Sequence, residues 1–163
     1  MSFDFDAMDH VYFMREALKE ADLAGQAGER PIGAVIVHQG QVIGRGRAQH
    51  QARHSGIAHA EMNALLQAEQ YIHAHLHDGC VIYTTLEPCV MCLGAIVMSD
   101  IDHIVYALAD NWIKPGKMLE LEHVRRHIKH YVGGILADES VKLWEQFNPR
   151  ELEMIQKGRL AGM

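Results

Sequence analysis

His59-Ala60-Glu61 and Pro88-Cys89-Val90-Met91-Cys92 are the two stretches that decide how this sequence is interpreted. One histidine and two cysteines are three zinc-type ligands, and a site with three protein ligands keeps a fourth position open for water, as catalytic zinc sites do. Glu61 lies two residues after His59, where its carboxylate can exchange a proton with that water. The motifs therefore predict metal-assisted hydrolysis, with zinc bound by His59, Cys89 and Cys92 and with Glu61 as the catalytic acid and base.

Other interpretations of the same residues remain open at this point. A Cys-x-x-Cys pair in a cytosolic protein can be a redox pair, although this leaves His59 and Glu61 without a role. A structural zinc needs a fourth ligand, for which His50 and His54 are nearest in the sequence. A non-catalytic module that keeps zinc as a staple does not need Glu61, so the complete set favours an enzyme.

The patterns around both motifs place them at helix N-termini. His59 begins a helical pattern that runs to about Gln70, and Pro88 precedes a second helix that begins near Cys89. Cysteines three residues apart on a helix share one face, so both thiols can reach one ion. The positive end of each helix dipole also favours thiolates there.

Helical and strand patterns alternate along the rest of the chain. We expect a helix from Asp9 to about Ala24, strands at 32–38, 41–47, 80–85, 103–107 and 131–132, and helices at 138–147 and from Pro149 onward. Residues 48–58 have the composition of a loop, and 108–127 is the least regular segment. Strands separated by helices favour an α/β fold with helices on both faces of the sheet. No repeat or linker interrupts the pattern, so we expect one domain over residues 1–163.

The composition favours a globular cytoplasmic protein that acts on a small molecule. The 15 Lys and Arg against 21 Asp and Glu give a formal net charge of -6, whereas nucleic-acid binders usually carry a basic stripe. No apolar run approaches the ~18 residues of a membrane span, and the acidic N-terminus does not have the pattern of a signal peptide. The third cysteine, Cys80, opens an apolar run and is expected in the core. His73, His75 and His77 resemble a metal chelate but are expected to form a solvated surface, and His123, His127 and His130 are expected to be surface or packing residues.

The motifs also resemble those of the cytidine and deoxycytidylate deaminase superfamily, especially its bacterial tRNA adenosine deaminases and guanine deaminases. The resemblance covers nearly the whole chain and is carried by residues 31–35, 42–44, 59–61, 85–92, 94–96 and 134–139. It implies a three-layer α/β/α fold around a mixed five-stranded sheet, a homodimer, and one Zn²⁺ per subunit. It implies His59, Cys89 and Cys92 as ligands and Glu61 as proton shuttle, with backbone amides near Ala60 and Cys89 positioning water and the substrate ring.

The chain departs from these relatives where they recognise substrate. The family often has an Asn after the second strand that hydrogen-bonds a purine; Ala48 stands there in this chain, and Gln49 replaces it if the loop shifts. Ser55-Gly56-Ile57 stands where the family often has Asp-Pro-Thr. The segment that is Gly-rich in the tRNA enzymes carries Trp112, which is expected either to cover the ring as a lid or to anchor an irregular segment.

The resulting hypothesis is a zinc-dependent hydrolytic deaminase that releases ammonia from a nucleobase, a nucleoside or a related aminated heterocycle. Its expected substrate-binding positions are Ala48, Gln49, Ala60 and Trp112. The alternative is a tRNA-specific adenosine deaminase that converts adenosine to inosine in the anticodon loop. The basic run at residues 125–130 supports this alternative, although such a run is more often a solvated helix face.

Overall fold

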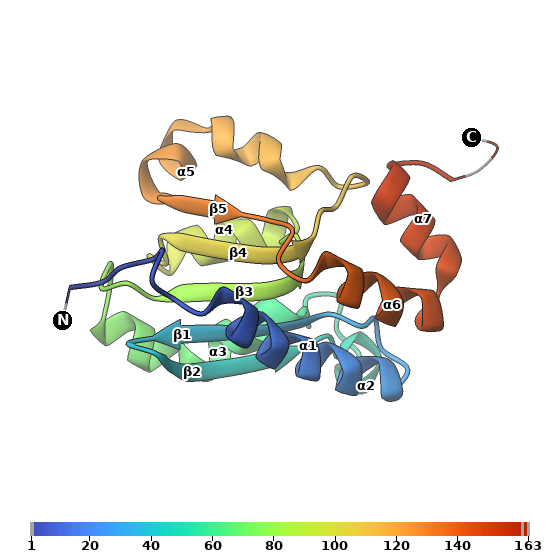
Figure 1. The fold of residues 1–163 in the computed structure, drawn as a ribbon, viewed down its shortest axis with the longest axis horizontal. Coiled ribbons are helices and arrows are strands. Elements are labelled where there is room, and N and C mark those ends of the chain that lie inside the picture. Colours follow the sequence, from blue (N-terminus) through green and yellow to red (C-terminus); the bar gives the residue numbers. More distant parts are fainter. Residues whose placement is uncertain (1, 161, 163) are drawn as a thin grey trace.

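The computed structural model describes residues 2–160 and 162, and its centre is one five-stranded sheet (Figure 1). The strands are β1 (Gly33–His38), β2 (Gln41–Arg47), β3 (Val81–Leu86), β4 (His103–Leu108) and β5 (His130–Val132). Their order in the sheet is β2-β1-β3-β4-β5. β1 is antiparallel to both β2 and β3, while β3, β4 and β5 are parallel to one another, so the sheet is mixed.

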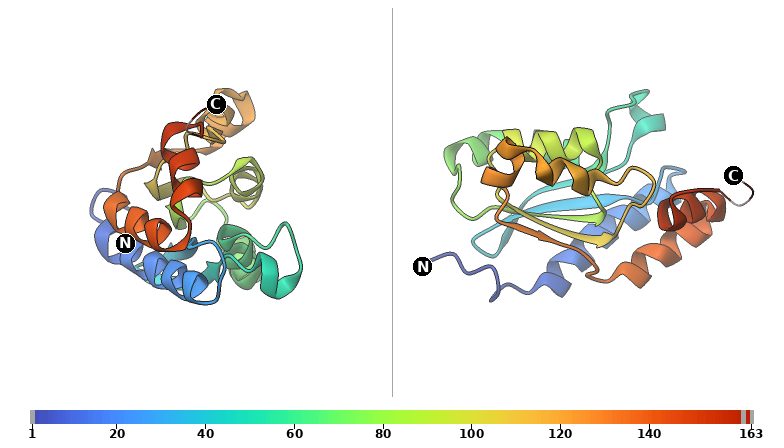
Figure 2. Two further views of the ribbon diagram at one scale, coloured as in Figure 1. Left: turned by 90° about the vertical axis from the view of Figure 1, so that its right-hand side faces the viewer. Right: turned by 90° about the horizontal axis from the view of Figure 1, so that it is seen from above.

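Helices cover both faces of this sheet, as the edge-on view in Figure 2 shows. They are α1 (His10–Gln26), α2 (His50–Arg53), α3 (Ala60–Ala74), α4 (Val90–Met98), η1 (Pro115–Glu120), α5 (Glu122–His127), α6 (Ala137–Phe147) and α7 (Pro149–Lys157). α1 and α6 lie on one face, and α3, α4 and α5 lie on the other. This arrangement confirms the expected three-layer α/β/α fold.

The alternation of side chains along β1 builds the two cores. Ala34 and Ile36 pack into the cluster that includes α3 and α4, whereas Val35 and Val37 pack into the cluster that includes α1. All residues of β1 and β3 are buried, as expected for strands covered on both faces. The core thus fixes the helices that carry the two motifs.

Two glycines let helices approach the sheet closely, one on each face. A Cβ at Gly33 would lie 2.1 Å from Ala17 O of α1, and a Cβ at Gly46 would lie 2.1 Å from Ala60 O of α3. Neither position accepts a side chain without displacing a helix. Gly46 therefore sets the position of the turn that begins α3, where His59 lies.

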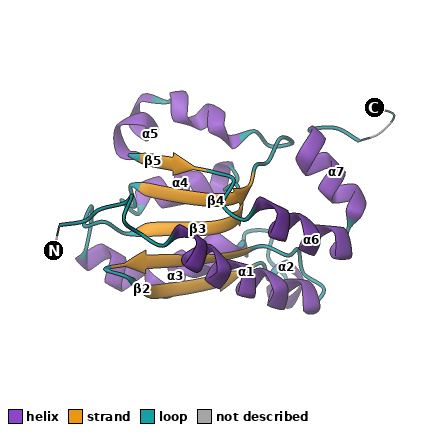
Figure 3. Ribbon diagram, viewed as in Figure 1, coloured by secondary structure: helices purple, strands orange, loops and turns teal. Residues whose placement is uncertain are grey.

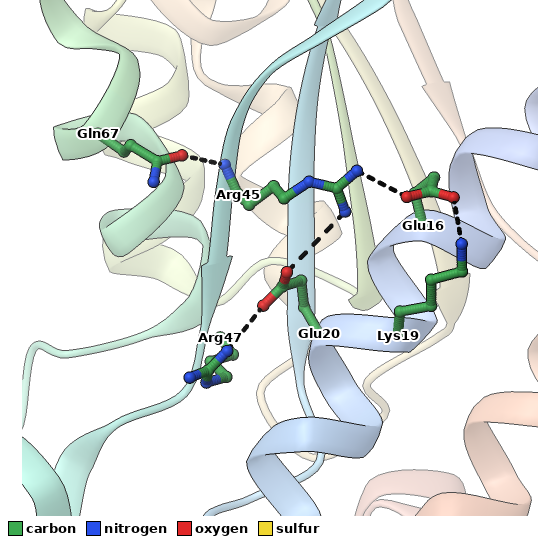
Figure 4. A network of polar contacts seen from close by, with 6 residues as sticks. All are labelled: Glu16, Lys19, Glu20, Arg45, Arg47 and Gln67. Carbon is green, nitrogen blue, oxygen red and sulfur yellow. Dashed lines mark hydrogen bonds and ion pairs between the residues drawn. The ribbon is translucent and has the colours of Figure 1, made fainter.

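Polar contacts at the β2 edge join α1 and α3 to the sheet (Figure 4). Arg45 Nη2 donates to Glu16 Oε2 at 2.6 Å, and Arg45 Nη1 lies 3.9 Å from Glu20 Oε1. On the other side, the backbone N–H of Arg45 donates to Gln67 Oε1 at 2.6 Å. The N–H of Arg45 is thus satisfied and charges flank it, which makes this part of the edge strand poorly suited to pairing with another chain.

The structure corrects the expectations for two segments and confirms others. Within the expected loop 48–58, α2 forms because the Glu29 carboxylate accepts the N–H groups of Gln51 and Ala52 at its start, a cap supplied from 22 and 23 residues away. Within the irregular segment 108–127, η1 and α5 form, and α5 has Glu122 in its first turn and three basic residues in its last. Cys80 is buried, as expected, and the two histidine clusters are exposed or half-buried. Among the described residues, no helix has the length and apolarity needed to span a bilayer.

Candidate active site

The two motifs meet because each begins a helix on the same face of the sheet. His59 is the extended N-cap residue of α3, and Cys89 is the extended N-cap residue of α4. His59 Nδ1 lies 3.5 Å from Cys89 Sγ and 3.5 Å from Cys92 Sγ. The Cys89 sulfur also accepts the backbone N–H of Cys92 at 3.4 Å, so the helix start itself orients the sulfur.

These three side chains fit a zinc ion. Their ligand atoms all lie within 4.8 Å of one another, and no other group of three ligand-type residues is this close among the described residues. Zn–S bonds of ~2.3 Å and Zn–N bonds of ~2.0 Å at tetrahedral angles place ligand atoms roughly 3.5 to 3.8 Å apart. The His50 ring stands 4.9 Å from the His59 ring between centroids, but neither His50 nor His54 belongs to the group. The described structure thus offers three protein ligands.

The two thiols of this group differ in acidity. The neighbouring thiol of Cys92 and the imidazole of His59 lower the pKa of Cys89 to about 4, because both stabilise its thiolate. The contact with Cys89 and burial together raise the pKa of Cys92. Both sulfurs bind zinc as thiolates, so zinc binding would release the proton of Cys92.

Glu61 stands beside this group in a buried position. Its side chain is only 4% exposed, and the Thr84 hydroxyl of β3 lies 2.8 Å from Glu61 Oε1. Burial raises the pKa of Glu61 above the usual range for a glutamate. A carboxyl group that is held in place and whose pKa lies closer to neutrality is suited to both accepting and donating a proton.

A cavity of about 280 Å³ opens at the same edge of the sheet. Because β1 is antiparallel to both neighbours, the beginning of β1 and the ends of β2, β3 and β4 meet at this edge. Ile32, Ala48, Leu86 and Asp110, which flank or end these strands, accordingly line the cavity. The carboxyl ends of strands in α/β sheets are common ligand sites.

α7 forms another wall of the cavity. Asn148 breaks the helical pattern with φ -158° and ψ 91°, and Pro149 begins α7 in a new direction (Figure 3). Glu151, Met154 and Ile155 of α7 line the cavity. The Asn148 side chain caps the new helix by accepting the N–H of Glu151 at 3.2 Å.

The position of α7 is fixed at both ends. The N–H of Asn111 donates to Ile155 O at 2.8 Å, and its side-chain amide donates to Gln156 O at 2.6 Å. At the other end, Arg30 Nε contacts Glu151 Oε1 at 2.5 Å. These contacts join α7 to the segment after β4 and to the segment before β1.

The four expected substrate-binding positions are not equivalent in the structure. Ala48 and Trp112 line the cavity. Trp112 is 47% exposed, which agrees better with a lid over the cavity than with a buried anchor for an irregular segment. The Gln49 side chain instead accepts a hydrogen bond from Arg53 Nε at 3.0 Å, and it lines a groove beside β2. Ala60 is buried in the core below the cavity, and as the first residue of α3 it has a backbone N–H without an intrahelical partner.

Several residues at the site were absent from the expectations based on sequence. Thr84, Asp110, Arg30 and Glu151 reach it from four different elements or loops. The Asn148-Pro149 pair signals that a helix stops and restarts, but it does not give the direction of the new helix. Trp144 also lines the cavity; its indole nitrogen has no hydrogen-bond partner in the part of the chain that is described.

Comparison with protein families agrees with this geometry. The family model for the cytidine and deoxycytidylate deaminase zinc-binding region matches residues 7–108, which include both motifs. The chain belongs to this deaminase family. It is therefore a zinc-dependent hydrolytic deaminase, which acts on the amino group of a nucleobase, nucleoside or related heterocycle.

Individual relatives fall into two groups by substrate. A tRNA-specific adenosine deaminase of Streptococcus pyogenes is 34% identical over 160 residues, which cover 91% of this chain and 90% of the relative. The solved structure of a tRNA:A34 deaminase has a TM-score of 0.68 at 33% identity and covers 81% of this chain and 98% of the other. A guanine deaminase of Bacillus subtilis has a TM-score of 0.59 at 32% identity and covers 71% and 73%. Relatives of this family thus act on tRNA or on a free heterocycle.

Proposed function

We propose that this deaminase acts on a free aminated heterocycle or its nucleoside. The observation that carries the proposal is the position of α7, which turns at Pro149 and lies along the cavity, fastened by Asn111 and Arg30. A base that stays attached to an RNA backbone needs an open rim beside its pocket. A free ring needs only the pocket, and about 280 Å³ is close to the lower end of the volumes typical of small-molecule sites.

Charge around the cavity supports the same substrate class. Glu87, Asp110 and Glu151 line it together with Glu61, and the lining cation Arg30 is paired with Glu151. RNA binding relies on unpaired basic groups that contact phosphates. A neutral or amino-rich ring is compatible with acidic walls, whereas a phosphodiester backbone is repelled by them.

The chain's own residues divide the chemistry as follows. His59, Cys89 and Cys92 would hold the ion, which when bound activates a water molecule as a nucleophile. Glu61 takes one proton from the attacking water and passes it to the ring nitrogen, and it then takes the remaining hydroxyl proton and passes it to the amino group, which leaves as ammonia. Thr84 holds Glu61 Oε1, which leaves Oε2 for the proton transfers. The apolar walls contributed by Ile32, Leu86 and other residues exclude competing water.

Ammonia release from a panel of rings tests the proposal. The zinc-loaded protein is incubated with guanine, adenine, cytosine, their nucleosides and diaminotriazines, and ammonia is measured against a zinc-free control. Release from at least one free ring or nucleoside is expected. If no member of the panel yields ammonia, the small-molecule function is wrong.

Deamination of adenosine in tRNA is the second candidate, because tRNA-specific adenosine deaminases are 34% identical over most of the chain. The basic residues Arg125 and Arg126 are exposed on α5 and are not part of the cavity wall. Binding of an anticodon stem-loop should weaken steeply with salt if phosphate contacts form. Inosine formation in the stem-loop together with such salt dependence would favour this candidate over a free ring.

We further propose that residues 1–163 form a single deaminase domain, which works as a homodimer in the cytosol. Exposed apolar side chains on α3 and α4 support the dimer, namely Leu66, Val90 and Met98. Clusters of exposed apolar residues often mark protein contacts. Light scattering on the eluting protein should give twice the chain mass, and Met98→Glu should lower it.

A further inference from the structure

Asp110 is a buried carboxylate held rigidly at the cavity. It lies two residues beyond β4, and its own N–H donates to Glu87 Oε1 at 3.0 Å. Its Oδ1 accepts the N–H groups of Trp112 and Ile113, each at 2.9 Å. Only 4% of the residue is exposed, and it lines the cavity. The turn thus fixes both the position and the rotation of the carboxylate.

The second oxygen of this carboxylate is free. Across the described residues, Asp110 Oδ2 has no hydrogen-bond partner, whereas Glu87 uses Oε1 for Asp110 N and Oε2 for the Tyr131 hydroxyl. This oxygen is not among the fully enclosed side-chain atoms without a partner, so it keeps contact with the open space of the cavity that Asp110 lines and can accept a hydrogen bond there. An acceptor oxygen of this kind in a cavity wall indicates that a bound ligand supplies the hydrogen-bond donor.

The reacting end of the cavity is nearby. His59, Glu61 and Cys89 line the same cavity as Asp110. Ala48 contributes only a methyl group to the wall, and its N–H is already bonded to Ile32 O at 3.0 Å. Recognition of a polar ring edge therefore falls to another residue.

We propose that Asp110 determines specificity by accepting a hydrogen bond from a second N–H group of the substrate. The preferred substrates are then rings that carry a further amino group besides the one released, such as diaminopyrimidines or diaminopurines. An oxo group at the same position would place its lone pairs against the carboxylate. This inference rests on the proposed function, because it names the class of free ring that the same site accepts.

The expected discrimination follows from the strength of the bond. Hydrogen bonds to ionised groups are about twice as strong as neutral ones. Sites that hydrogen-bond a substrate N–H or O–H reject analogues without it, because a buried polar group is then left unpaired. We expect at least a ~10-fold preference for an amino group over an oxo group at the second position.

A matched pair of rings tests this preference without turnover. 2,4-Diaminopyrimidine and cytosine share the 4-amino group and differ in an amino or oxo group at position 2 and, with it, in N1, which carries a hydrogen only in cytosine. Zinc-loaded Glu61→Gln protein is titrated calorimetrically with each ring. The diamino ring should bind about 10-fold tighter or better. Equal dissociation constants, or no binding of either ring, overturn the inference.

Asp110→Asn in the same background identifies the group responsible. Asparagine keeps an Oδ1 acceptor for Trp112 and Ile113, but it replaces Oδ2 with an amide that donates. The preference for the diamino ring should disappear or reverse. Asp102→Asn is the control, since Asp102 is equally buried (3% exposed) but is not among the residues that line the cavity. A preference that survives Asp110→Asn refutes the role of Asp110.

The outcomes distinguish a failure of this inference from a failure of the proposed function. In one outcome, wild-type protein deaminates free rings while the ratio of the kcat/KM values for the two pyrimidines is the same in wild type and in Asp110→Asn. In that case only the inference fails. If no ring of the panel is deaminated, the proposed function fails. Should Asp110→Asn not fold, the titrations of the Glu61→Gln protein still test the inference, because equal dissociation constants for the two rings overturn it.

Discussion

Thr84 and Glu61 form a buried hydrogen-bonded pair, with Thr84 Oγ1 2.8 Å from Glu61 Oε1 and 3.1 Å from Leu86 O. A hydroxyl has one proton and can also accept one. Thr84 can therefore donate to the ionised carboxylate, or accept from the protonated form while donating to Leu86 O. The same contact accommodates Glu61 in both protonation states, as a residue that accepts and returns a proton requires.

Replacement of Thr84 tests this positioning. Thr84→Val keeps the side-chain shape but removes the hydroxyl, so Glu61 should lose its orientation and kcat should fall by about tenfold or more, with KM less affected. Thr84→Ser keeps the hydroxyl and is the control, with activity near wild type. Steady-state kinetics on the substrate identified by the ring panel give both values. An equal loss in both variants would attribute the effect to packing.

Glu61→Gln separates catalysis from metal binding. The amide is nearly isosteric and keeps an oxygen for Thr84, so fold and zinc content should be unchanged. An amide cannot shuttle protons at neutral pH, and turnover should therefore fall by about 10²–10⁴-fold. Metal analysis and ammonia release on the same preparation measure the two effects. Unchanged turnover would remove Glu61 from its assigned role.

Gly46→Ala should disturb the site from outside it. The new Cβ would meet Ala60 O at 2.1 Å and Ala64 N at 2.4 Å, so α3 must move away from β2 and carry His59 and Glu61 with it. Overpacking of this kind costs about 1–3 kcal/mol of unfolding free energy. Denaturant unfolding should show this loss, and zinc affinity should fall as well. Gly56→Ala is the control, because nothing lies within 4 Å of a Cβ there.

The metal-free protein should show three thiols of different reactivity. The pKa of Cys89, lowered to about 4, leaves it a thiolate above that pH, whereas burial raises the pKa of Cys80 to about 11 and keeps it protonated at pH 7. Thiolates are the nucleophilic form. Iodoacetamide at pH 7 should therefore label Cys89 first and spare Cys80, as mass spectrometry of peptides would show. Zinc should protect Cys89; labelling unaffected by zinc would contradict its role as a ligand.

The sequence predicts the metal group well because its geometry is local. A histidine at one helix start and cysteines three residues apart at another need only two helix N-termini on one face of the sheet to meet. The same logic fails for Asp110 and α2, because each depends on partners distant in sequence, Glu87 for one and Glu29 for the other. The irregular backbone of residues 109–114 has no periodicity from which its course could be predicted.

The anchoring of α7 decides how the cavity is closed, and Asn111 tests it. In Asn111→Ala the backbone bond to Ile155 O remains, while the side-chain bond to Gln156 O is lost, so α7 should stay helical but hold its place less firmly. Removing one such bond costs about 1 kcal/mol. If α7 is a wall for a free ring, KM should rise several-fold while kcat changes little, because Glu61 and the metal ligands are untouched.

Gln67→Ala is the matched control for Asn111→Ala. It removes a side-chain amide whose oxygen accepts a hydrogen bond from Arg45 N at 2.6 Å at the β2 edge, and Gln67 is not part of the cavity wall. A similar loss of stability is expected from both variants, and a rise in KM only from Asn111→Ala. Equal KM values in the two variants would mean that α7 does not contact the substrate. This result would remove the main support for a free ring as the substrate and would favour a site that is open to a larger substrate.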